Sequence, residues 1–206
     1  MNRLTRLAEH FQTVGRAISD SGHDPVPVLA LTGEHADLII TMPHNGKEID
    51  PVVVLLVQQL AFPIGMQTMV LGVSSWVAPN DDKYDGVPLQ EVVDTDADVK
   101  SALLTTACDV RTSDVEAVIG LESLNDEGRS VWVEYKTKHP WRDEALAAFR
   151  EAALDEWFAE GGKPLFMSRP ERSILIDSTV HHLSGHFDLA VERFAPGSIE
   201  GLCSAK

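Results

Sequence analysis

The stretch VEAVIGLESLNDEGRSVWVEYKT, residues 115–137, contains two runs rich in β-branched residues on either side of a polar turn. Val115–Leu121 and Ser130–Thr137 are the two runs, and Asn125-Asp126-Glu127-Gly128 is the turn. Strand-forming residues that flank a short polar segment with glycine predict an antiparallel hairpin. A hairpin in the middle of the chain favours an antiparallel sheet over a strict alternation of parallel strands and helices.

The residues before the hairpin predict two helices and three strands. Apolar residues at steps of three and four predict a helix over residues 4–18, which Gly22 is placed to end. Val26–Thr32, Leu38–Met42 and Met66–Ala78 are the three expected strands. A cap-like sequence, Thr95-Asp96-Ala97-Asp98, predicts that a second helix begins there, with Leu103, Thr106 and Ala107 facing inward.

The segment Val52–Val57 leaves two structures open. Asp50-Pro51 is a favourable start for a helix, which would run to about Ala61 before Pro63 and Gly65 stop it. The six residues of the segment are nevertheless apolar and mostly β-branched, which is typical of a buried strand. The sequence does not decide between the two structures.

The residues after the hairpin predict one helix and two strands. Trp141–Ala159 has its apolar residues on one helical face and two glycines after its end. Ser173–Val180 and Phe187–Phe194 are expected to be strands. The whole order predicts an α+β fold, with residues 1–206 as a single globular domain and helices packed against a mixed or mostly antiparallel sheet.

The charge of the chain argues against several classes of function. The 206 residues include 32 Asp and Glu against 17 Lys and Arg, so the formal net charge is −15. A field of this sign repels phosphate backbones, so no nucleic acid partner is expected. No apolar run approaches the roughly 20 residues that a membrane span needs. The two cysteines have no metal-ligand spacing, and together with the absence of a signal-peptide pattern they indicate a soluble cytoplasmic protein.

The longest loop-like stretch, Pro79–Val92, is the expected contact with a partner. It contains Asp81, Asp82, Tyr84 and Asp85 among glycine, proline and asparagine residues. Long exposed loops carry function more often than the elements that they join. Its acidic residues would suit a protein partner with a basic surface.

Histidines near the C-terminus form a candidate metal site for a hydrolase. His181, His182 and His186 lie within six residues, and Asp188 follows. Histidine nitrogen and carboxylate oxygen are ligands for zinc and other transition metals. On the expected strand, His186 and Asp188 would share one face, and His181 could reach them across a turn. The spacing matches no established metal motif, and a polar turn explains the same residues.

The second expected strand of the hairpin carries a candidate nuclease site. Glu134 and Lys136 are two residues apart and would point to the same side of a strand, where the acid could hold Mg²⁺ and the amine could orient water. Asp114, before the first strand, could supply a second acid. Glu-x-Lys resembles the arrangement in metal-dependent nucleases of the restriction-endonuclease type, although a solvated strand face explains it equally well.

No phosphate-binding glycine loop and no EF-hand loop is present in the sequence, and Gly72-Val73-Ser74-Ser75-Trp76 lacks the second glycine of a nucleophile elbow. The default hypothesis is therefore a binding or regulatory protein that has no catalytic activity and needs no cofactor. The alternatives are a hydrolase with a divalent metal at His181–Asp188 and a nuclease-like site at Glu134 and Lys136.

Overall fold

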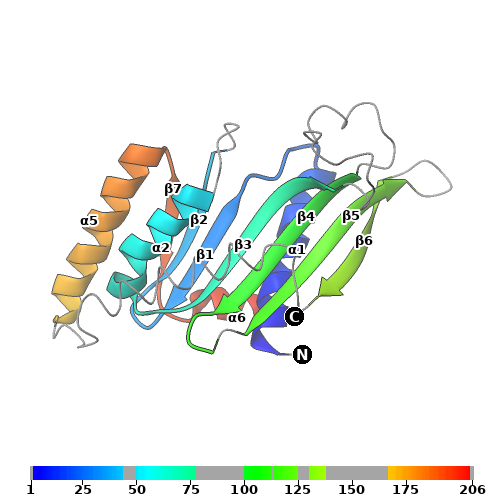
Figure 1. The fold of residues 1–206 in the computed structure, drawn as a ribbon. Coiled ribbons are helices and arrows are strands. Elements are labelled where there is room, and N and C mark those ends of the chain that lie inside the picture. The colour runs from blue at the N-terminus through cyan, green and yellow to red at the C-terminus, as the bar shows by residue number, and fades with distance from the viewer. Residues whose placement is uncertain are drawn as a thin grey trace.

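A computed structural model describes residues 2–43, 50–77, 100–112, 114–124, 130–137 and 167–204, and places a sheet between two layers of helices (Figure 1). The described strands are β1 (Val28–Gly33), β2 (Asp37–Thr41), β3 (Met66–Val77), β4 (Lys100–Asp109), β5 (Val115–Leu124), β6 (Ser130–Thr137) and β7 (Ala190–Phe194). The described helices are α1 (Arg3–Asp20), α2 (Asp50–Ile64), α5 (Arg169–Phe187) and α6 (Ser198–Ser204).

The sheet is antiparallel at each of its six pairings, in the order β6-β5-β4-β3-β1-β2-β7. The hairpin predicted around residue 125 is confirmed as β5 and β6, with Gly120 opposite Glu134. The predicted strands at residues 26–32, 38–42 and 66–78 are confirmed as β1, β2 and β3 within a few residues. The fold is therefore of the α+β class, as the sequence predicts.

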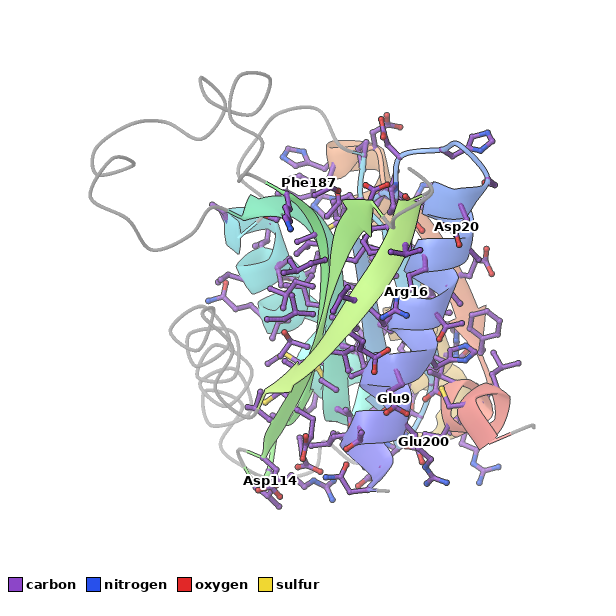
Figure 2. All side chains as sticks on the ribbon, turned by 90° about the vertical axis from the view of Figure 1, so that its right-hand side faces the viewer. Glu9, Arg16, Asp20, Asp114, Phe187 and Glu200 are labelled. Atoms are coloured by element: carbon purple, nitrogen blue, oxygen red, sulfur yellow. The ribbon has the colours of Figure 1, made fainter. Side chains whose placement is uncertain are left out.

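The two faces of the sheet carry different helices (Figures 1 and 2). Helix α1, confirmed where the sequence predicts it, packs with α6 on the face that we call the α1 face. Helices α2 and α5 pack on the opposite face, the α2 face. Each face has its own apolar core, because alternate residues of every strand point to opposite sides.

The strand β4 corrects the prediction of a helix that would begin near residue 95 and bury Leu103, Thr106 and Ala107. These three residues lie in β4, between β3 and β5. Seven consecutive residues of β4 are buried: α1 packs against one face of the strand, and residues on the other face, such as Leu104, belong to the core on the α2 face. A strand buried on both faces needs no alternation of polar and apolar residues, so its sequence resembles that of a buried helix.

The undecided segment Val52–Val57 is helical and belongs to α2. Val53, Leu56 and Leu60 of this helix are fully buried or nearly so. Helix α2 contacts both the sheet and α5, so more than one side of it is covered. This position explains why its sequence is apolar all round.

Helix α5 corrects the predicted strand Ser173–Val180. Ser168 caps the helix: its hydroxyl accepts from the backbone N–H of Glu171, and the Glu171 carboxylate accepts from the backbone N–H of Ser168 at 2.8 Å. Pro170 in the first turn also favours a helix. The buried Ile176 and Leu183 are seven residues apart, which places them on the same side of a helix.

The last predicted strand, Phe187–Phe194, is confirmed only from Ala190 onward. Phe187 is the final residue of α5, and Asp188 follows it in the left-handed conformation with φ 56°. The chain reverses there and pairs β7 with β2. The predicted helix Trp141–Ala159 and the predicted loop Pro79–Val92 lie outside the described residues. In the part of the chain that the structure describes, no helix is long and apolar enough to cross a membrane.

Asp37 connects the first hairpin to the last helix. Its side chain is fully buried, and its two oxygens accept hydrogen bonds from the backbone N–H groups of Gly33, at 3.2 Å, and Ile199, at 3.0 Å. One carboxylate therefore fixes the β1–β2 turn and the start of α6 together. Two backbone donors would be left buried without this acceptor.

We expect Asp37→Ala to lower the free energy of unfolding by about 1–3 kcal/mol, because it leaves both N–H groups without their acceptor. Asp24→Ala is the matched control, since Asp24 is exposed, and should stay within about 0.5 kcal/mol of the unmodified protein. Urea denaturation followed by circular dichroism measures both. Equal stabilities of the two variants would contradict the role given to Asp37.

Candidate functional site

A cavity of about 270 Å³ lies between α1 and the sheet. Its walls come from α1, the segment before β1, strands β1 to β4 and α6. The lining residues are His10, Phe11, Gln12, Val14, Gly15, Ile18, Pro25, Val26, Val28, Ile39, Thr41, Gly72, Val73, Ser74, Leu103, Leu104, Thr105, Ile199 and Leu202. Most of these side chains are apolar, so the cavity offers a hydrophobic surface to a ligand.

The cavity exists because small residues face the C-terminal half of α1. Gly72 and Ser74 are two apart on β3, and both line the cavity. A Cβ placed on Gly72 would have its nearest neighbours at 3.9 Å, so there is room beside this residue. Farther along the same face, Gly120 of β5 is in close contact with Gln12 and has no such room. Helix α1 thus sits closely on β5 and stands away from β3.

The polar groups on the floor of the cavity are already bonded to one another. The Gln12 side chain is buried, with Nε2 donating to the carbonyl of Leu103 at 3.2 Å and Oε1 accepting from the Thr105 hydroxyl at 2.8 Å. The Ser74 hydroxyl donates to the carbonyl of Pro25 at 3.2 Å. No aspartate, glutamate, lysine or arginine is found among the described residues that line the cavity.

The mouth of the cavity is unusually apolar. Val14, Val26 and Leu202 are 44%, 38% and 54% exposed, and all three line the cavity. They are half of the six large apolar side chains that are exposed in the described part of the chain. The lining of the cavity therefore extends from exposed side chains to buried ones such as Leu104. An exposed apolar patch of this kind marks a binding surface more often than an accident of packing.

Cys203 is partly buried and packs against the apolar core on the α1 face. Burial raises the pKa of its thiol, and the Glu200 carboxylate raises it further. The thiol therefore stays protonated near neutral pH and is a poor nucleophile. This residue contributes to packing.

Of the candidate nuclease residues, Glu134 and Lys136 lie two apart on β6, as expected, whereas Asp114 lies far from Glu134. Glu134 forms an ion pair with Arg16 of α1 at 2.8 Å, and its backbone lies opposite Gly120. Asp114 precedes Gly120 by six positions on the neighbouring strand, a distance of about 20 Å along the strand. Figure 2 shows Asp114 at the opposite end of α1 from Asp20. Lys136 belongs to β6 opposite Val118. The observed role of Glu134 is to hold α1 on the sheet.

The candidate metal residues lie on a helix, so the strand geometry expected for them was wrong. His181 and His186 belong to α5, and Asp188 follows its end. His182 and His186 are one turn apart with ring centroids 6.4 Å apart and nearly parallel rings. Within the described residues, no three His, Cys, Asp or Glu side chains are grouped to hold a metal ion.

The predicted partner contacts Asp81, Asp82, Tyr84 and Asp85 lie outside the described residues, and their role stays a prediction. Comparison with protein-family models, with curated proteins and with solved structures finds no match for this chain. The cavity under α1 is the feature that sequence reasoning missed. Its one signal in the sequence is the pair Gly72 and Ser74, two small residues on the same face of an otherwise bulky strand.

The contact between Gly120 and Gln12 gives a test of how α1 is seated. A Cβ at Gly120 would lie 2.4 Å from Gln12 Nε2, which is held by its own hydrogen bonds. We expect Gly120→Ala to lower the free energy of unfolding by about 1–3 kcal/mol through overpacking. Gly185→Ala on exposed α5 meets no atom within 4 Å and should instead stabilise by about 0.5–1 kcal/mol. Thermal unfolding measures the stability of both variants. If Gly120→Ala and Gly185→Ala destabilised the protein equally, the close contact would be disproved.

Proposed function

We propose that this chain is a binding protein for a small, neutral, apolar molecule that enters the cavity between α1 and the sheet. The observation that carries the proposal is the combination of an apolar cavity with an exposed apolar mouth formed by Val14, Val26 and Leu202. Concave, mostly apolar sites with a few polar groups are the usual form of small-molecule sites. Catalysis is not part of the proposal.

The size of the cavity sets the size of the ligand. A cavity of about 150 Å³ holds benzene, and small-molecule sites commonly begin near about 300 Å³. At about 270 Å³, this cavity would take nearly twice the volume of benzene. A molecule of about ten carbon atoms, such as naphthalene or 1-decanol, is therefore the expected scale.

The lining argues that the ligand is uncharged. An ion in the cavity would lose its hydration without gaining an oppositely charged partner, which costs on the order of several kcal/mol. The hydroxyls of Thr41, Ser74 and Thr105 remain near enough to orient one polar group, since hydroxyl oxygens can accept a further hydrogen bond. A neutral molecule with one hydroxyl group, which can donate to these oxygens, fits this lining best.

Filling the cavity from inside tests the proposal. Gly72→Val adds a β-branched side chain at a strand position where its Cβ meets no close neighbour. We expect this variant to keep or raise its melting temperature, because glycine weakens a strand interior, and to bind 1-decanol and naphthalene at least about tenfold more weakly. When either ligand is titrated into the unmodified protein, the methyl NMR resonances of Val14, Val26 and Leu202 should shift.

A matched pair on the surface supplies the control. Leu202→Ser removes an apolar side chain from the mouth, whereas Ile174→Ser removes an exposed apolar side chain from α5, away from the cavity. Only the first should weaken binding. Absence of saturable binding of both ligands by the unmodified protein, or equal weakening by the two serine variants, would overturn the proposed function.

A further inference from the structure

A second pocket, of about 750 Å³, lies at the other end of the β1–β2 hairpin. The turn between these strands contributes Glu34 and His35, α5 contributes Arg169 and Arg172, and β7 contributes Arg193. The elements that supply these residues are far apart in the sequence and meet only in the fold. This pocket does not share a described lining residue with the cavity under α1.

The described lining of this pocket is rich in arginine, although the chain as a whole is acidic. The chain carries −15 and contains ten arginines, three of which line this one pocket. The acid in its wall, Glu34, is paired with a further arginine, because Arg111 donates to its carboxylate at 2.6 Å. That contact lowers the pKa of Glu34. One of the three, Arg193, is itself paired with Asp177 of α5. The described wall of the pocket therefore contains three arginines and one acid, Glu34.

Arg172 is the fixed part of the pocket. It is only 9% exposed, and its Nη1 donates to the carbonyls of Phe62 and Pro63, at 3.4 and 3.3 Å, where α2 ends. Its guanidinium carbon lies 5.6 Å from the centre of the Phe62 ring. A guanidinium group has five N–H donors in a rigid plane. Arg172 is therefore held in one orientation before any ligand arrives.

Arg169 stands where a cation is disfavoured. It is the first residue of α5, and the N-terminus of a helix carries partial positive charge. Burial lowers the pKa of His35, and the charges of Arg172 and Arg169 lower it further. The imidazole thus registers a positive potential from both arginines. A bound anion would relieve this repulsion, as no described acid in the wall does apart from Glu34.

We propose that this pocket binds the phosphate group of a small-molecule phosphate ester, with Arg169 and Arg172 as its principal contacts. Guanidinium groups match the geometry and charge of phosphate through paired N–H···O bonds. The helix N–H groups near Ser168 do not serve this purpose, because Ser168 and Glu171 already cap α5. The volume exceeds the space that one phosphate ion needs, which leaves room for the rest of an ester.

Removal of one positive charge tests the site. Arg169 is exposed, so Arg169→Gln should fold normally, whereas Arg172→Gln would disturb the end of α2. With inorganic phosphate and phenyl phosphate as probes at constant ionic strength, we expect Arg169→Gln to weaken binding by about tenfold or more. Arg6→Gln removes the same charge from the exposed surface of α1 and should leave binding unchanged. Isothermal titration calorimetry measures all three proteins.

The two probes distinguish the sources of the phosphate. Tighter binding of phenyl phosphate supports an ester as the ligand, and equal or tighter binding of inorganic phosphate identifies the free ion as the occupant of the same site. No saturable binding of either probe at millimolar concentration, or equal losses in the Arg169 and Arg6 variants, would overturn the proposal.

The pKa of His35 distinguishes phosphate binding from a purely structural role of the arginines. If the arginines were only structural, phosphate would leave this pKa unchanged. The groups that face His35 are Glu34 on its own turn, with Arg111 bonded to it, and the arginines of α5 and β7. In the free protein its pKa lies below the ordinary value, so the folded state favours neutral His35 and loses stability as pH falls through that ordinary value. We expect saturating phosphate to raise the His35 pKa and to reduce this loss. Imidazole NMR across pH 4.5–8 measures the shift, and a His35 pKa that phosphate leaves unchanged would refute binding at this site.

Discussion

The central strands of this sheet are buried on both faces, and the rest of the architecture follows from that constraint. Leu29 and Ala30 of β1 are neighbours in the chain, both fully buried, and each points to a different helical layer. Sheet faces of this kind need cover on each side. Among the described residues, α2 and α5 cover the α2 face, whereas the long helix α1 and the short helix α6 cover the α1 face. The cavity is found on the side with the thinner cover, above Gly72 and Ser74.

Much of the fold could be predicted from local patterns. The polar segment between the two runs of the predicted hairpin and the apolar face of α1 are local signals that tertiary structure did not override. The errors came where burial removed the pattern. In β4 the run from Ala102 to Cys108 is buried without alternation. In α5 the β-branched residues favour a strand locally, whereas the capping sequence Ser168-x-x-Glu171 favours the helix that forms. An apolar helix between a sheet and a second helix, as in α2, stays ambiguous for the same reason.

The two pockets could not be predicted, because neither is a property of one segment. The arginine pocket brings residue 35 beside residues 169, 172 and 193, and only the sheet order reveals that β7 lies next to β2. The apolar cavity depends on how far α1 stands from β3. Residues that looked functional in sequence turned out to have other contacts. Arg16 of α1 donates to Glu134, and the Trp132 indole N–H donates to Asp20 of α1 at 3.2 Å. These side chains of β6 therefore hold α1 on the sheet.

The bond between Asp37 and the backbone of Ile199 joins residues 162 positions apart. The pairing of β2 with β7 is similarly distant in the sequence. Contacts at such separation require closure of a very long loop and slow the folding of antiparallel sheets. During synthesis, the outer edge of β2 stays unpaired until β7 has emerged from the ribosome, because β7 is its neighbour there. The other strands, β1 to β6, can pair before β7 is made.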